Sequence, residues 1–251
     1  MQKGAKILDL QYFSDRCRYI FGLNPSLPAP TDTQLKKLYE LTERMLKVNE
    51  SMNLTAITDV DGVILKHYAD SLTISEYIPE GSRIIDVGCG AGFPTLPLAI
   101  FRPDISITAL DGTAKRIEYV RATAELLGLE NVKAVAARAE EFSNKLDNRE
   151  SFDIATARAV AALPVLAELC LPFVKKNGKF IAMKASQGEN EALSASNAIK
   201  ICGGGNTEII KADLFGPNDA CEQRIIVRVT KISSTPAKYP RHYSQISKKP
   251  L

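Results

Sequence analysis

Three alternating glycines mark the stretch Asp86-Val87-Gly88-Cys89-Gly90-Ala91-Gly92-Phe93-Pro94. It follows a short apolar run at residues 83–86 and leads into a helix-like stretch near residues 93–101. Glycine accepts positive φ angles and lets a ligand approach the backbone closely. In open α/β sheets, ligands bind at such turns, beyond the carboxyl ends of the strands. We therefore expect this glycine-rich turn to hold a ligand.

Strand-like and helix-like segments alternate after Gly81. The expected strands are residues 83–86, 105–110, 132–136, 153–156 and 179–183. The expected helices are residues 93–101, 114–127, 139–145, 163–171 and 189–201. This alternation predicts an α/β fold with a doubly wound, mostly parallel sheet. Two later strands, 208–211 and 223–232, are joined by a loop too short for a crossover helix, so we expect them to pair antiparallel at one edge.

The first eighty residues read as an N-terminal helical extension. Apolar residues recur there at helical spacing, and Thr31 with Gln34 three residues later resembles a capping box. The prolines between Asn24 and Pro30 indicate a connector between two helices. We therefore divide the chain into the extension (1–80), a ligand-binding domain (81–237) and a basic C-terminal tail (238–251).

Composition places the chain among ordinary globular proteins. Of its 251 residues, 45% are hydrophobic and 24% charged, which argues against disorder. No apolar run is long enough for a membrane span, and the N-terminus lacks a signal-peptide layout, so we expect a cytoplasmic protein without a membrane partner. The five cysteines are scattered, which favours reduced thiols and no metal site. From Lys231 onward there are five basic residues and no acidic one.

The glycine spacing distinguishes between two kinds of nucleotide cofactor. A dinucleotide fingerprint needs glycine at its sixth position, where this chain has Phe93. Asp86 would also place a negative charge close to a pyrophosphate, whereas the cationic S-adenosylmethionine tolerates it. The second expected strand leads to Asp111, 25 residues after Asp86, and its carboxylate can accept hydrogen bonds from ribose hydroxyls. S-adenosylmethionine is thus the expected cofactor.

Several motifs in order along nearly the whole chain resemble the RsmG (GidB) family of bacterial methyltransferases. They are Asn53-Leu54-Thr55, His67 with Asp70-Ser71-Leu72, the glycine-rich turn, Arg138-Ala139-Glu140-Glu141, Arg158-Ala159-Val160-Ala161, Tyr239-Pro240-Arg241 and Lys249-Pro250-Leu251. The resemblance implies a Rossmann-like class I methyltransferase domain. It also implies methylation of nitrogen 7 of a guanine in small-subunit (16S) ribosomal RNA, near the decoding site.

The turn and the resemblance together define the expected cofactor residues. These are Asp86, Gly88, Gly90, Gly92, Phe93, Asp111, Gly112, Thr113, Ala139, Glu140 and Arg158. The chain departs from the family pattern at Cys89, where serine or alanine is common, and at Thr95 and Ala185, where glycine is common. Cys89 has no histidine near it in sequence and is interpreted as a small turn residue rather than a nucleophile.

Nitrogen 7 of guanine carries a lone pair and no proton, so its methylation needs no general base, and we name no catalytic residue. The expected RNA-binding residues are His67, Lys184, Arg241, Lys248 and Lys249. Around Arg241, aromatic rings interleave with charge, as they do on nucleic-acid surfaces. His67 and Asp70 share one helix face, as either a structural hydrogen-bonded pair or an RNA contact.

The expected partner is small-subunit ribosomal RNA or the small ribosomal subunit, and the expected oligomeric state is a monomer. Two other functions stay open on the sequence. The chain could methylate a small molecule or a protein with the same cofactor, in which case ribosomal RNA would not be a substrate. It could also be a nonenzymatic RNA-binding protein of the same fold, which would bind no cofactor.

Overall fold

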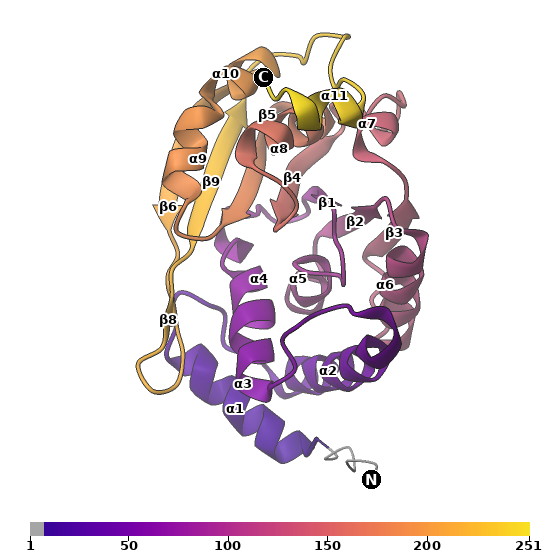
Figure 1. The fold of residues 1–251 in the computed structure, drawn as a ribbon. Helices are drawn as coiled ribbons and strands as arrows, with labels where there is room; N and C mark the ends of the chain where they lie inside the picture. Colours follow the sequence, from indigo (N-terminus) through magenta and orange to yellow (C-terminus); the bar gives the residue numbers. More distant parts are fainter. Residues whose placement is uncertain (1–7) are drawn as a thin grey trace.

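A seven-stranded sheet runs through the centre of the structure, a computed structural model that describes residues 8–251 (Figure 1). Its strands are β1 (Arg83–Val87), β2 (Ser106–Asp111), β3 (Val132–Ala136), β4 (Phe152–Arg158), β5 (Val174–Lys184), β6 (Gly204–Lys211) and β9 (Ile225–Lys231). Their spatial order is β3-β2-β1-β4-β5-β9-β6. The strand order reverses between β1 and β4, so the carboxyl ends of these two strands flank a crevice suited to a ligand.

The predicted mostly parallel sheet is confirmed. Strands β1 to β5 pair in parallel, while β9 pairs antiparallel with both β5 and β6. The antiparallel strand therefore lies between β5 and the edge strand β6. The connection from β6 to β9 holds a two-stranded hairpin that the sequence did not indicate, made of β7 (Leu214–Phe215) and β8 (Cys221–Glu222). Both strands have only two residues, too few to show an alternating pattern.

Helices cover both faces of the sheet and enclose two hydrophobic cores. On β1, Ile84 contributes to the first core and Ile85 to the second, because successive side chains of a strand point to opposite faces. The first core is covered by α5 (Thr95–Phe101), α6 (Ala114–Leu126) and the N-terminal helices. The second is covered by α7 (Ala139–Phe142), α8 (Leu163–Cys170), α9 (Gly188–Ser194), α10 (Ser196–Ile201) and α11 (Tyr243–Lys248).

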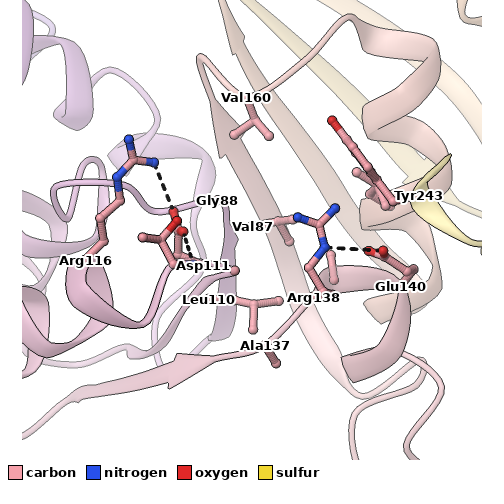
Figure 2. A pocket seen from close by; sticks show the side chains of 14 residues that line it. Val87, Gly88, Leu110, Asp111, Arg116, Ala137, Arg138, Glu140, Val160 and Tyr243 are labelled. Carbon is pink, nitrogen blue, oxygen red and sulfur yellow. Dashed lines mark hydrogen bonds and ion pairs between the residues drawn. The ribbon is translucent and has the colours of Figure 1, made fainter. Parts of the chain in front are cut away.

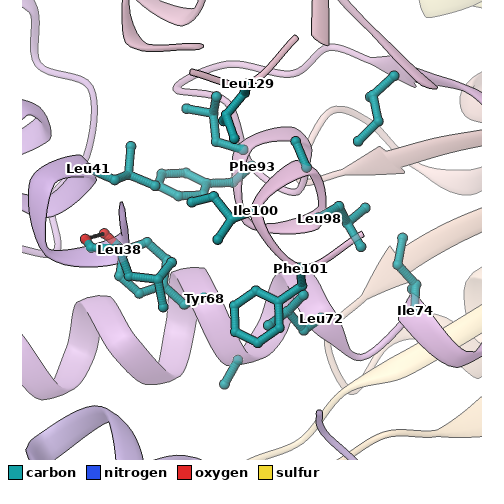
Figure 3. Packing of buried hydrophobic residues seen from close by; sticks show 14 of the residues in the cluster. Leu38, Leu41, Tyr68, Leu72, Ile74, Phe93, Leu98, Ile100, Phe101 and Leu129 are labelled. Atoms are coloured by element: carbon teal, nitrogen blue, oxygen red, sulfur yellow. Dashed lines mark hydrogen bonds between the residues drawn. The ribbon is translucent and has the colours of Figure 1, made fainter. Parts of the chain in front are cut away.

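The N-terminal helices share the first core with the sheet (Figure 3). They are α1 (Leu10–Gly22), α2 (Asp32–Met52), α3 (Val60–Val63), the π-helix η1 (Ile64–Ala69), α4 (Asp70–Leu72) and the short 3-10 helix η2 (Ser75–Tyr77). The predicted capping box is present: the Gln34 backbone N–H donates to the Thr31 hydroxyl, and the Gln34 side chain accepts from the Thr31 backbone N–H. Leu38 and Tyr68 are fully buried against α5, and burial of an apolar side chain such as Leu38 stabilises the fold by about 1.5–3 kcal/mol.

The C-terminal end of the chain is folded onto the sheet domain. It forms α11, whose Ile246 is fully buried in the second core. The expected helix at residues 189–201 is two helices instead, α9 and α10, which meet at Ala195. No helix within residues 8–251 combines the length and the apolarity that crossing a membrane would require.

Candidate cofactor and substrate site

The glycine-rich turn adopts a backbone that requires glycine. Gly88, Gly90 and Gly92 have φ angles of 79°, 56° and 88°, in the region that other residues rarely enter. A Cβ on Gly88 would lie 2.6 Å from Cγ2 of Val160. The backbone N–H groups of Gly88 and Cys89 both donate to the carbonyl of Leu110, at 2.7 and 3.0 Å, which ties the turn to the end of β2.

Asp111 connects the glycine turn to the loop after β2. One carboxylate oxygen accepts from the Gly90 backbone N–H at 3.0 Å, and the other accepts from the Thr113 backbone N–H at 2.8 Å. The guanidinium of Arg116 lies 3.9 Å away. The carboxylate is thus fixed at the strand end, a position from which an acidic side chain can accept hydrogen bonds from ribose hydroxyls.

Two cavities meet over this turn. The first, of about 220 Å³, lies beyond the ends of β1 to β4 and extends to α11 (Figure 2). The second, of about 340 Å³, covers the glycine turn and reaches the N-terminal helices. Gly88, Asp111, Arg116 and Val160 line both. An adenosine group in the first cavity and an amino-acid group in the second would therefore share Asp111, which fits S-adenosylmethionine.

Most of the expected cofactor residues line these cavities. Gly88, Asp111, Gly112, Thr113, Ala139 and Glu140 line the first, whereas Gly88, Gly90, Phe93, Asp111 and Arg158 line the second. Asp86 and Gly92 line neither. Asp86 is fully buried beneath the turn, where its carboxylate accepts a 2.6 Å hydrogen bond from the Thr95 hydroxyl. Burial raises the pKa of Asp86 to about 6. Its side chain shapes the turn rather than facing either cavity.

Arg158 reaches the second cavity from the end of β4. Its guanidinium donates to the Asp70 carboxylate at 2.7 Å and to the Lys66 carbonyl at 2.9 Å, and its Cζ lies 5.5 Å from the centroid of the Phe93 ring. The carboxylate of Asp70 also accepts from Arg224 at 2.9 Å. The two arginines thus neutralise the buried Asp70 and join the N-terminal helices to the sheet.

His67 lies in the second cavity and stacks on Phe93, with ring centroids 4.5 Å apart and planes within 9°. Its Nε2 is 2.9 Å from the Thr55 hydroxyl, and its buried Nδ1 has no hydrogen-bond partner among the described residues. No hydrogen bond joins His67 to Asp70, so the structural-pair interpretation is wrong for these two described side chains. Burial, followed by the nearby charge of Arg158, lowers the pKa of His67 to about 4.

The depressed pKa of His67 predicts acid sensitivity. A histidine whose pKa falls from 6.5 in the unfolded chain to about 4 in the folded chain stabilises the fold above pH 6.5, and this stability is lost as the pH falls towards 4. The loss should be about 3 kcal/mol. Urea unfolding of the parent protein and of His67→Asn between pH 7 and 4 measures it. The parent should lose this amount relative to the variant, and equal pH dependence of the two would contradict the expectation.

Sequence reasoning missed Arg138 and Tyr243, which line the first cavity (Figure 2). Arg138 Cζ lies 4.4 Å from the centroid of the Tyr243 ring, and Arg138 Nε lies 3.4 Å from a carboxylate oxygen of Glu140. Arg138 could have been found because it directly precedes the expected Ala139 and Glu140. Tyr243 belongs to the run of aromatic and charged residues around Arg241, which the sequence indicates as an RNA-binding surface.

The remaining expected RNA-binding residues differ in their surroundings. Lys184 is nearly buried and pairs with Glu191 at 2.7 Å. Arg241 forms an ion pair with the fully buried Glu168, with its Nη2 2.6 Å from a carboxylate oxygen. Of these four expected residues, only Lys248 and Lys249 have exposed side chains. Arg241 has a structural partner where a phosphate contact was expected.

Comparisons with known proteins agree with this geometry. Residues 34–214 match the GidB family model, described as rRNA small subunit methyltransferase G. The protein named ribosomal RNA small subunit methyltransferase G from Staphylococcus carnosus is 47% identical over 223 residues, covering 88% of this chain and 92% of its own. Its namesake from Lactobacillus delbrueckii subsp. bulgaricus is 41% identical over 238 residues, covering 93% and 95%.

Solved structures share the fold at much lower identity. A structure described as a candidate methyltransferase from Thermoplasma acidophilum superposes with a TM-score of 0.50 at 13% identity, covering 63% of this chain and 71% of its own. The family match spans well over half of the chain, and the two relatives exceed 40% identity over nearly all of it. The chain belongs to the rRNA small subunit methyltransferase G (GidB) family.

Proposed function

We propose that this chain transfers the methyl group of S-adenosylmethionine to nitrogen 7 of a guanine in small-subunit ribosomal RNA, near the decoding site. The observation that carries the proposal is the pair of cavities joined at Asp111 over the glycine-rich turn, in a member of this family. A ribosomal substrate places the reaction in the cytoplasm, where the chain would act as a monomer.

The cofactor would lie across both cavities. Asp111 would accept hydrogen bonds from the ribose hydroxyls, since it ends β2 at the point where the cavities meet. The adenine would extend into the first cavity, where the buried carboxylate of Glu140 can accept from its amino group. The amino-acid portion would lie over Gly88 and Gly90, whose missing side chains leave the backbone open to close approach.

The reaction requires the protein mainly to position the cofactor and the guanine relative to each other. When bound, the cofactor supplies an electrophilic methyl group. Nitrogen 7 of guanine has a free lone pair, so no side chain has to remove a proton. The guanine would share the second cavity with the amino-acid portion of the cofactor and lie beside the stacked rings of His67 and Phe93. Holding the two reactants in a fixed orientation accounts for most of the acceleration that such a site needs.

The target guanine should be unpaired. In an A-form helix, nitrogen 7 faces a deep, narrow major groove that a protein domain cannot enter. A base that is looped or loosely paired reaches a pocket at the smallest unstacking cost. Methyl transfer from labelled cofactor should be efficient on small subunits or whole ribosomal RNA and poor on an isolated hairpin. Efficient methylation of guanines inside perfect duplexes would contradict this expectation.

Methyl transfer, measured together with the binding of cofactor and of RNA, separates the proposed function from its two alternatives. Cofactor binding without methyl transfer to any ribosomal fraction would favour a small-molecule or protein substrate. RNA binding without cofactor binding would favour a nonenzymatic protein of the same fold. The experiment should include NAD as a competitor, since Phe93 occupies the sixth position of the turn and NAD should therefore not displace S-adenosylmethionine.

The exposed Lys248 and Lys249 should contribute to RNA binding. Lys248→Ala with Lys249→Ala removes two charges without touching the Arg241 ion pair. Each lost phosphate contact should reduce the slope of log affinity against log salt by about 0.7–0.9, while cofactor affinity stays unchanged. The control is Lys175→Ala with Lys176→Ala, an exposed pair near the amino end of β5. Equal salt slopes in the tail variant and the parent would rule out these contacts.

A further inference from the structure

The first cavity has a wall that comes from the far end of the chain. Tyr243, the first residue of α11, lines it together with residues that follow β2 and β3. The Tyr243 side chain is half-buried. In Figure 2, Tyr243 lies at the opposite end of the cavity from Asp111 and Arg116, beside Arg138 and Glu140. Tyr243, from a segment expected to be a tail, thus forms one wall of the first cavity, whose other walls come from the sheet domain.

Contacts outside the cavity hold this segment in place. On the N-terminal side of Tyr243, Arg241 uses its backbone N–H and its guanidinium to donate to the fully buried Glu168 of α8, at 2.6–2.9 Å. On the C-terminal side, Ile246 is fully buried in the second core. These two anchors fix α11 from both sides. Contacts within the protein therefore position the ring of Tyr243.

The chemistry of this end of the cavity suits a purine. Arg138 stacks on the Tyr243 ring, with Cζ 4.4 Å from its centroid, and pairs with Glu140. Leu110 and Ala137 provide apolar surface between the two ends. With the ribose at Asp111, the base must extend towards Arg138 and Tyr243, because the other direction leads over the glycine turn into the second cavity. A flat base would find an aromatic side chain, apolar surface and an acceptor there.

We propose that Tyr243 contacts the adenine of S-adenosylmethionine and that the segment Pro240–Lys249 is an integral wall of the cofactor site. This inference rests on the proposed cofactor assignment and deepens it. Tyr243 is remote from the reacting sulfonium end, so its contact is the same in the ground state and the transition state. Its loss raises the KM for the cofactor and leaves kcat unchanged.

Calorimetry with S-adenosylhomocysteine tests the contact. Tyr243→Ala should bind it about tenfold more weakly, the size expected for losing one aromatic contact to a base. Tyr243→Phe keeps the ring and should bind within about twofold of the parent protein. Gln245→Ala, which changes an exposed residue of the same helix, is the matched control and should bind like the parent. The loss should be equally large for 5′-methylthioadenosine, which lacks the amino-acid group.

A further variant separates base contact from undocking of the segment. Tyr243→Leu keeps apolar bulk against the second core, so its melting temperature should match that of the parent while its affinity falls as in Tyr243→Ala. Parental affinity in Tyr243→Ala or Tyr243→Leu would overturn the inference, as would equal losses in Tyr243→Phe and Tyr243→Ala. If the parent protein itself fails to bind S-adenosylhomocysteine, the proposed cofactor assignment falls instead.

Discussion

Replacement of Gly88 by valine should weaken S-adenosylmethionine binding by at least about 100-fold. The new Cβ would lie 2.6 Å from Cγ2 of Val160, and both residues line the two cavities at their junction. The added methyl groups would project into space that the cofactor needs. A β-branched residue is also strained at a φ of 79°. The variant should fold but should neither bind the cofactor by calorimetry nor methylate RNA.

Gly81→Val is the matched control for this variant. Gly81 also has a positive φ, 70°, but a Cβ there would meet no atom within 4 Å, and the residue precedes β1 at the amino end of the sheet. Both variants carry the same kind of backbone strain, of about 1–3 kcal/mol. Only Gly88→Val changes the cavities. Cofactor affinity retained in Gly88→Val, or lost equally in Gly81→Val, would be incompatible with the proposed cofactor site.

Arg241→Ala should lower the free energy of unfolding by about 3–5 kcal/mol, the usual cost of removing one partner from a buried ion pair. It leaves the carboxylate of Glu168 charged and fully buried with two fewer donors, since only the backbone N–H of residue 241 remains. Urea unfolding at pH 7 measures the change. Adding Glu168→Gln to Arg241→Ala removes the unpaired charge and should recover part of the loss.

An exposed ion pair of the same length provides the comparison. Arg18 lies 2.6 Å from Asp32, but 47% and 92% of their side chains are exposed. Arg18→Ala should therefore cost less than about 1 kcal/mol. Equal effects of Arg18→Ala and Arg241→Ala would show that the Glu168 pair does not anchor the C-terminal segment. If the Arg241–Glu168 pair anchors the C-terminal segment, Arg241→Ala should also weaken cofactor binding, because this segment places Tyr243 in the lining of the first cavity.

Elements with local signals could be predicted from the amino-acid sequence. Alternation of strands and helices predicted the doubly wound sheet, since each pattern lies within a stretch of 5 to 15 residues. The capping box at Thr31 was equally readable, because cap and partner are three residues apart. The glycine-rich turn was readable from the sequence for the same reason, because its positive φ angles require glycine whatever the rest of the chain does.

Contacts between residues far apart in the chain could not be predicted, because they depend on how the elements pack. Tyr243 reaches Arg138 across 105 positions, and Arg241 reaches Glu168 across 73, because α8 and α11 cover the same face of the sheet. A charged residue looks the same in sequence whether it faces solvent, RNA or a buried partner. Burial and pairing, which distinguish these possibilities, are set by the packing of the whole domain. The sequence therefore predicted a ligand at the glycine-rich turn, while packing placed Tyr243 of the expected basic tail in the lining of the first cavity.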